Sequence, residues 1–419
     1  MHTHKCDYDF FVIGGGCGGL SFAQEACQFG AKGAIADFVY PSPQGNKWGL
    51  GGTNLNVGSI AKKFMHIAAQ NGELHNQYVN MGYGDVDQKS NHEWKKLISR
   101  IQNYIKNTSW QYKIDLQNQE VKYYNAFASI IEKNKIELKY KNGDIEKVTA
   151  KFIIIAVGSR PKYLDVEGSP QHVITSDDLF QQENPPNKTL IVGASYVALE
   201  TAGFLNSFGY NVSVMVRSKI LRGFDQEIAS KIETHYKNHG IRFIKYSTIN
   251  KIVLQIGSDK KVYYKKQEQS YLNEESFDTI ILAIGREAQT KRLNLDKINL
   301  KIKNNGKIIC NEDDSTSVDG IFAIGDCVYK RPMLGSTAKK QVNCQQEDFL
   351  MGNRNLLVGL HYLGPHAGEV VQGYALAFLL NGTKEDFDKA AGIHPTSSEE
   401  FIGMKQFKGS GKMAKESGC

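Results

Sequence analysis

The chain is poor in the features that mark several classes of protein. It has 419 residues but only seven cysteines and nine prolines. No two cysteines stand in a C-x-x-C arrangement, so neither a zinc site nor a thioredoxin-type motif is indicated. No apolar run approaches a membrane span, and the first ten residues lack the apolar stretch of a signal peptide. We therefore expect a cytoplasmic protein with no metal and no membrane partner.

The positive charge is not organised for nucleic-acid binding. The net charge is +7, but lysines alternate with acidic residues along the chain, and the densest cluster, KKVYYKK around Tyr263, predicts an exposed hairpin. No basic stripe is joined to a nucleic-acid reader motif, so no nucleic-acid partner is expected. The length predicts two or three globular domains.

Near the N-terminus the sequence carries a complete dinucleotide fingerprint. An apolar run over residues 8–13 is followed by GGGCGG at 14–19, a helix-like stretch over 20–30, and a second apolar run over 33–36 that ends at Asp37. Strand, glycine turn, helix, strand and acid follow in the order of a Rossmann unit. Gly14 would permit the tight turn, Gly16 the approach of a pyrophosphate, and Gly19 close helix–strand packing. Asp37 would accept a hydrogen bond from a ribose hydroxyl.

A second unit of the same kind begins at Thr189. Its turn, GASYVA, contains Gly193, Ser195, Tyr196 and Val197, and its second strand ends at Arg217 instead of an acid. Arg222 follows. Arginines at this place can pair with the 2′-phosphate of NADPH, so NADPH is expected rather than NADH. The alternative is that both arginines are solvated surface charges.

Three further runs indicate how the two units are connected. FIIIAVGSR contains Gly158, TIILAIGR ends in Gly285 and Arg286, and GIFAIGD ends at Asp326. They are typical of a chain that leaves the first unit, forms the second and returns. We therefore predict an α/β protein with two Rossmann-like domains, the second inserted in the first. The first dinucleotide-binding domain would cover residues 1–165 and 289–335, and the NADPH-binding domain residues 166–288.

The segment WGLGGTNLNVGSIAKKFMH at 48–66 resembles the active-site segment of the large thioredoxin reductases, in the glutathione reductase-like family of pyridine nucleotide-disulfide oxidoreductases. The resemblance extends over most of the chain and includes PSPQGNKWGLGGT (41–53), ITSDDLF (174–180), GASYVALE (193–200), LGPHAGEVVQG (363–373) and GIHPTSSEE (392–400). It implies FAD and NADPH as cofactors, a homodimer, and thioredoxin or a small disulfide as substrate.

The resemblance also implies roles for individual residues. Lys62 would lie near the flavin and pair with Glu200, and Tyr196 would cover the nicotinamide face of the flavin. Thr53 belongs to the GGT tract of the active-site segment and would bind a cofactor, Ala128 would lie by the adenine of FAD, and Asp326 would contact its ribityl chain. His394, held by Glu399, would be the general acid/base; the alternative is a histidine packed at an interface.

The chain departs from the family in three places. Asn54 and Ser59 stand where the family has its redox cysteines, whose disulfide stores two electrons. The stretch after Asp326 is short, so the α+β dimerisation domain, about 355–409, is expected to be truncated. A flexible tail over 410–419 ends in Cys419. Because selenium-containing thioredoxin reductases end in Gly-Cys-selenocysteine-Gly, Cys419 is expected to be a redox thiol; the alternative is a frayed terminus.

These features leave three hypotheses for function. The first is an NADPH- and FAD-dependent enzyme of the thioredoxin-disulfide reductase type, acting in redox homeostasis. The second is a flavin-dependent NADPH oxidase or quinone reductase that needs no thiol carrier. The third is a non-catalytic paralogue or a mispredicted gene product, which would retain the framework alone.

Overall fold

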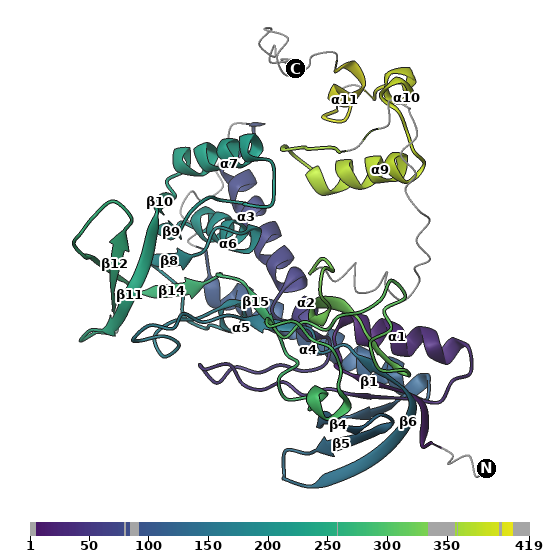
Figure 1. Cartoon of the computed structure of the whole chain (residues 1–419). Coiled ribbons are helices and arrows are strands. Elements are labelled where there is room, and N and C mark those ends of the chain that lie inside the picture. The colour runs from purple at the N-terminus through teal and green to yellow at the C-terminus, as the bar shows by residue number, and fades with distance from the viewer. Residues whose placement is uncertain are drawn as a thin grey trace. The chain divides into compact units, whose positions relative to one another are not determined.

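The computed structural model describes residues 6–78, 81–83, 92–257, 259–333, 357, 359–393 and 396–404. The chain divides into two compact units (Figure 1). The first comprises residues 1–222 and 232–345, and the second comprises residues 223–231 and 346–419. His394 and Cys419 lie outside the described residues.

A seven-stranded sheet forms the base of the first unit. Its order is β3 (Lys122–Tyr124), β2 (Gly33–Ala36), β1 (Tyr8–Ile13), β6 (Ile145–Ile155), β5 (Lys135–Lys139) and β4 (Phe127–Glu132), and β16 (Ile321–Ala323) also pairs with β6. The pairings among β3, β2, β1, β6 and β16 are parallel, whereas β4 and β5 add antiparallel strands. The described residues of this unit also form the helices α1 (Cys17–Gln28), α2 (Gly52–Asn56), α3 (Ser59–Tyr78) and α4 (Trp94–Asn118).

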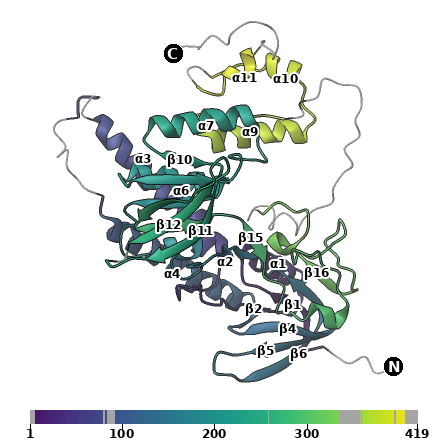
Figure 2. The same cartoon turned by 60° about the vertical axis from the view of Figure 1, so that its left-hand side comes forward.

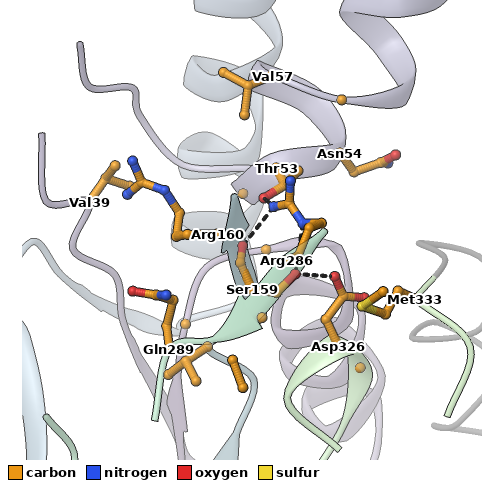
Figure 3. A pocket seen from close by; sticks show the side chains of 18 of the residues that line it. Val39, Thr53, Asn54, Val57, Ser159, Arg160, Arg286, Gln289, Asp326 and Met333 are labelled. Atoms are coloured by element: carbon orange, nitrogen blue, oxygen red, sulfur yellow. Dashed lines mark hydrogen bonds between the residues drawn. The ribbon is translucent and has the colours of Figure 1, made fainter. Parts of the chain in front are cut away.

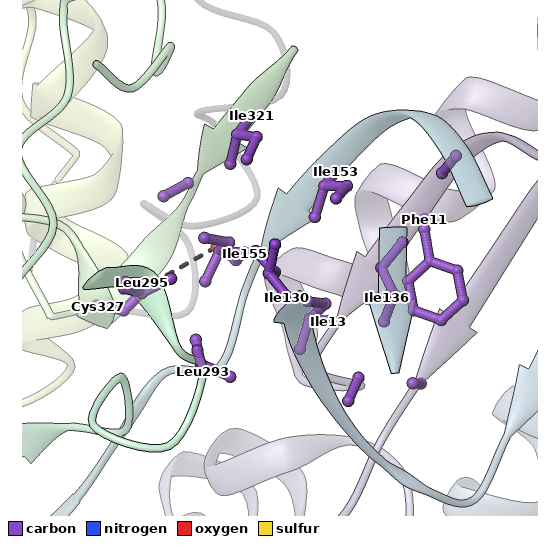
Figure 4. Close-up of a cluster of buried hydrophobic side chains, with 14 of the residues drawn as sticks. Phe11, Ile13, Ile130, Ile136, Ile153, Ile155, Leu293, Leu295, Ile321 and Cys327 are labelled. Carbon is purple, nitrogen blue, oxygen red and sulfur yellow. Dashed lines mark hydrogen bonds between the residues drawn. The ribbon is translucent and has the colours of Figure 1, made fainter. Parts of the chain in front are cut away.

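Buried aliphatic side chains hold this sheet together (Figure 4). Phe11 and Ile13 of β1 pack with Ile153 and Ile155 of β6, and all four are at most 3% exposed. Burial on both faces explains why β1 is a continuous apolar run and not an alternating one. The sheet therefore fixes the carboxyl end of β1, where the first glycine turn begins.

A second parallel sheet is built from the residues between β6 and β16. Its order is β10 (Arg242–Lys245), β9 (Val212–Val216), β8 (Thr189–Val192) and β14 (Thr279–Leu282). Two helices accompany it, α6 (Tyr196–Ser207) and α7 (Gln226–Asn238), and the Tyr236 hydroxyl donates to the Leu199 carbonyl at 3.0 Å. The insertion of one nucleotide-binding fold within another is therefore as expected, while the domain boundaries remain predictions.

An antiparallel sheet of β11 (Ser247–Leu254), β12 (Lys260–Lys266) and β13 (Asn273–Phe277) is also inserted here (Figure 2). The lysine-rich segment around Tyr263 is its central strand, not a lone hairpin. Val262 and Tyr264 are buried in the core of the inserted domain, because they lie on the opposite face of the strand from Lys261. Lys261 pairs with Glu274 at 2.7 Å.

Short elements join the two folds. Strand β7 (Ser159–Pro161) pairs antiparallel with β15 (Arg286–Ala288), so the chain leaves and re-enters the first fold side by side. Helix α5 (Ser176–Leu179) begins with a capping box at Thr175. The 3₁₀ helices η2 (Leu295–Ile298) and η3 (Gly325–Cys327) complete the return.

The described residues of the second unit form helices α9 (Ala367–Leu379), α10 (Lys384–Lys389) and α11 (Glu400–Gly403). Tyr374 lies between Phe387 and Phe401, with ring centroids 5.0 and 5.1 Å away. Glu399 is the residue that precedes α11.

Among the described residues, none of the helices has the length and apolar character needed to span a membrane.

Candidate dinucleotide-binding site

A cavity of about 630 Å³ opens at the carboxyl ends of β1 and β6 in the first unit. This size is within the range of small-molecule and cofactor sites. Twelve residues expected from the sequence to bind a cofactor line it: Gly14, Gly16, Asp37, Thr53, Lys62, Ala128, Gly158, Tyr196, Val197, Glu200, Arg286 and Asp326. Residues separated by up to 312 positions in the sequence are thus brought around one space.

The glycine turn after β1 has little room for any side chain. Gly14 has φ +115°, and a Cβ there would lie 2.4 Å from the Ala156 carbonyl oxygen; a Cβ on Gly19 would lie 2.0 Å from the Gly14 carbonyl oxygen. At Gly16 the nearest atom to an added Cβ, the Gly52 Cα, is 3.8 Å away. The first and third glycines are therefore required by the fold, whereas the second leaves open space at the N-terminus of α1.

Asp37 lies at the end of β2 and accepts a hydrogen bond from the Gly15 N–H at 2.8 Å. Burial raises the pKa of this carboxyl, and the N–H groups of Gly15 and Phe38 lower it. The glycine turn therefore positions the carboxylate at the cavity wall.

An interdomain polar cluster forms another wall of the cavity (Figure 3). The Ser159 hydroxyl donates to Asp326 at 2.6 Å and accepts from Arg286 Nε at 2.8 Å. Arg286 also donates to the Thr53 hydroxyl at 3.1 Å and to the Ser159 carbonyl at 2.7 Å. Burial lowers the pKa of Arg286, while Asp177 and Asp326 raise it. The cluster joins β7, β15, η3 and α2.

A buried ion pair lies beside this cluster. Arg160 Nε donates to Asp177 at 2.5 Å, a second nitrogen of Arg160 donates to the Tyr40 carbonyl at 2.9 Å, and its guanidinium carbon lies 4.5 Å from the ring centre of Trp48. Burial raises the pKa of Asp177, and Arg160 and Arg286 lower it. The pair fixes the loop that follows Asp37 against α5.

Lys62 and Glu200, which also line the cavity, form an ion pair. The Lys62 ammonium donates to both Glu200 carboxylate oxygens at 2.9 Å, and their side chains are 33% and 42% exposed. The pair joins α3 to α6, and α6 begins at Tyr196, whose side chain also lines the cavity. Burial and the Glu200 carboxylate raise the pKa of the Tyr196 hydroxyl.

Asn54 and Ser59 also line the cavity, on α2 and at the first residue of α3. Cys17 is the one described cysteine in the lining, and no second described cysteine stands beside it there. The described part of the wall therefore carries no dithiol.

The glycine turn of the inserted fold repeats the geometry of the first. Gly193 has φ +135°, and a Cβ there would lie 2.3 Å from the Ala283 carbonyl oxygen. Ser195 precedes α6. Arg217 and Arg222 are both exposed after β9, and Arg222 donates to the Ser218 hydroxyl at 2.8 Å. Gly285, with φ +119°, lies before β15.

Residues 8–341 match the family model described as pyridine nucleotide-disulphide oxidoreductase. The chain belongs to this family. Residues 349–404 match the model of the family's dimerisation domain.

Members of the pyridine nucleotide-disulphide oxidoreductase family include relatives that align with the whole chain. Thioredoxin reductase SEP1 of Emiliania huxleyi is 35% identical over 497 residues, covering 100% of both proteins. Two thioredoxin reductases of Plasmodium falciparum, from isolates FCH-5 and 3D7, are each 35% identical over 509 residues, covering 100% of the chain and 93% and 81% of the relatives. Because these alignments exceed 419 positions, the relatives carry segments without a counterpart here.

FAD and NADPH, the cofactors expected from the sequence, are those of the family. The cavity fits a dinucleotide, because a side chain is absent at Gly16, the N-terminus of α1 lies in the cavity wall, where its N–H groups can bind a phosphate, and Asp37 supplies a hydrogen-bond acceptor. Gly14, Gly16, Asp37, Ala128 and Asp326 would hold FAD. The second glycine turn, like the first, leaves no room for a side chain at Gly193, and the exposed guanidinium groups of Arg217 and Arg222 can pair with the 2′-phosphate of NADPH. These residues therefore fit NADPH.

Several residues of the site were not predicted from the sequence. Ser159 adjoins the predicted Gly158, and its position directly after a strand-ending glycine is the one local signal for it. Arg160, Asp177 and Tyr40 gave no such signal, and neither did Arg292, which also lines the cavity, because no motif or periodicity links each of them to its contact partners. The predicted roles of His394 and Cys419 concern residues outside the described part of the chain.

Proposed function

We propose that the chain is an NADPH-dependent FAD flavoprotein of the thioredoxin-disulfide reductase type that passes electrons to small acceptors without a core dithiol. The observation that carries this proposal is the position of Asn54 and Ser59 in the cavity wall, beside an otherwise complete cofactor framework. The amide of Asn54 and the hydroxyl of Ser59 cannot store two electrons, because only a pair of thiols can be oxidised to a disulfide and reduced again. In this proposal the chain keeps the residues that bind FAD and NADPH, but it lacks the dithiol that receives electrons from the flavin in the family.

Each part of the wall has a distinct task in this proposal. When bound, FAD accepts a hydride from NADPH and supplies two electrons to an acceptor. Lys62, held by both oxygens of Glu200, keeps a positive charge at the cavity, which favours an anion there. The Tyr196 ring excludes water until the nicotinamide enters. Ser159 and Arg286 hold Asp326 in place.

A quinone is the acceptor class we favour. NADPH, a proton and a quinone give NADP⁺ and a hydroquinone, so electrons and protons balance without a thiol. Dioxygen could take the same two electrons, giving hydrogen peroxide with uptake of the same proton. Neither acceptor needs a residue that changes its oxidation state.

Reduction of a disulfide is the second candidate, supported by the thioredoxin reductase names of the relatives. NADPH and a proton would then reduce a disulfide that joins Cys419 to a cysteine of thioredoxin, giving NADP⁺ and two thiols. The match to the dimerisation domain supports a homodimer, and in it His394, held by Glu399, would exchange a proton with the Cys419 thiol of the partner subunit. This route and a cytoplasmic location remain proposals.

Restoring the dithiol separates the two candidates. The Asn54→Cys/Ser59→Cys variant should gain two thiols that titrate after reduction and disappear on oxidation, and it should gain disulfide reduction with NADPH. The single variants Asn54→Cys and Ser59→Cys are matched controls that should gain neither. The unsubstituted protein should oxidise NADPH with menadione as acceptor but leave thioredoxin and an aromatic disulfide unreduced. Reduction of either disulfide at the rate of the double variant would refute the proposal, and protein that binds no flavin would favour a non-catalytic framework.

A further inference from the structure

The loop after Asp37 places an aromatic cluster at one end of the cavity. The rings of Phe38 and Tyr40 lie 4.9 Å apart, and Phe127 lies 6.3 Å from Phe38 and 5.5 Å from Tyr40, in edge-to-face arrangements. All three line the cavity beside Ala128. Because Asp37 is the expected ribose acceptor, this is the adenosine end of the site.

Arg292 contacts this aromatic cluster through the ring of Tyr40. Its guanidinium carbon lies 4.1 Å from the ring centre of Tyr40, which is the distance of a cation stacked on an aromatic face. The neighbouring Leu293 carbonyl accepts from the Ile130 N–H at 3.0 Å, so the segment that carries Arg292 is fixed to β4. Tyr40 is fixed in turn by the bond from Arg160 to its carbonyl.

The charge of Arg292 is not used in an ion pair. Within the described residues its guanidinium has no carboxylate within salt-bridge distance, whereas its neighbour Lys291 pairs with Glu287 at 3.6 Å. Arg292 is exposed and lines the cavity. A planar cation on a tyrosine at the cavity wall has the chemistry that stacks on a nucleobase.

We propose that the stacked pair of Arg292 and Tyr40 is a cover for the adenine of FAD, and that it controls how tightly the adenosine half of the cofactor is held. The inference rests on the proposed placement of FAD in this cavity. The pair makes the protein selective for FAD over FMN, because FMN lacks the adenosine half and cannot reach the cover. It acts by binding alone and takes no part in electron transfer.

The test compares two flavins on flavin-free, full-length protein. Arg292→Leu and Tyr40→Leu should each raise the dissociation constant for FAD by about 5- to 30-fold, the range of a partly desolvated cation–π contact. The dissociation constant for FMN should change less than about twofold. The double variant should weaken FAD binding no more than the stronger single variant, because either change removes the same stacked unit. Binding is followed by the quenching of flavin fluorescence.

Two further variants sharpen the result. Arg292→Lys retains the charge without the plane and should bind FAD as weakly as Arg292→Leu. Lys303→Leu removes a cation that lies 5.1 Å over the Tyr329 ring outside the cavity and should leave both flavins unaffected. Full FAD affinity in Arg292→Leu or Arg292→Lys, or an equal loss of FMN affinity, would overturn the proposal. Unsubstituted protein that binds neither flavin would instead overturn the placement of FAD on which it rests.

Discussion

Replacing Asp177 by asparagine is expected to destabilise the first unit strongly. The Asp177 and Arg160 side chains are 2% and 19% exposed, and their closest atoms are 2.5 Å apart. The amide keeps the shape of the carboxylate but leaves Arg160 as an uncompensated, largely buried cation. Breaking such a pair costs about 3–5 kcal/mol, and since Arg160 keeps its bond to the Tyr40 carbonyl, we expect about 3 kcal/mol.

Urea unfolding, followed by circular dichroism and by tryptophan fluorescence, measures this loss. Trp48 lies under the Arg160 guanidinium and reports on the site itself. Arg160→Met and the double variant Arg160→Met/Asp177→Asn complete a double-mutant cycle, whose coupling energy should exceed about 1 kcal/mol, the upper value for an exposed pair. A loss below about 1 kcal/mol in Asp177→Asn, with no coupling in the cycle, would refute the reasoning.

Two further predictions concern the pH dependence of stability and the glycine turn. Burial lowers the pKa of His92 below its usual 6.5, and its buried Nδ1 has no hydrogen-bond partner among the described residues. The unfolded state therefore binds the proton more readily, so the free energy of unfolding should fall as the pH drops below 6.5. Urea unfolding at several pH values should show a smaller fall in His92→Phe. Substitution of the exposed His66 should leave the fall unchanged. Gly19→Ala should prevent correct packing of α1 and leave little soluble protein, because its Cβ would meet a backbone oxygen at 2.0 Å. Gly16→Ala should fold and unfold like the unsubstituted protein but bind FAD at least about tenfold more weakly in fluorescence titrations; normal FAD affinity would show that no phosphate approaches this turn.

The two nucleotide-binding folds could be predicted from the sequence because their signals are local. The strand, turn and helix of each fingerprint lie within about 30 residues, the length of a single βαβ unit. Gly14 and Gly193 occupy positions where backbone oxygens leave no room for a Cβ, so their identity follows from the turn itself. The helix after the first turn was predicted to begin at residue 20, but α1 begins three residues earlier, at Cys17.

The polar contacts between the folds could not be predicted in this way. Ser159, Arg286 and Asp326 meet through the pairing of β7 with β15 and the return of the chain to the first sheet. No periodicity links such distant positions. The Lys62–Glu200 pair was expected only from the family resemblance, and the geometry now shows both oxygens of Glu200 in contact with Lys62.

The central claim is that the cofactor framework is retained while the thiol carrier beside it is absent. An anaerobic titration of the FAD-loaded protein with NADPH, recorded as visible spectra, tests this most directly. The account predicts that about one equivalent of NADPH per flavin removes the absorbance of oxidised FAD, with no long-wavelength charge-transfer band between a thiolate and the flavin. Uptake of a second equivalent together with such a band would contradict the account, because it would require a redox-active thiol at a site where the chain has Asn54 and Ser59.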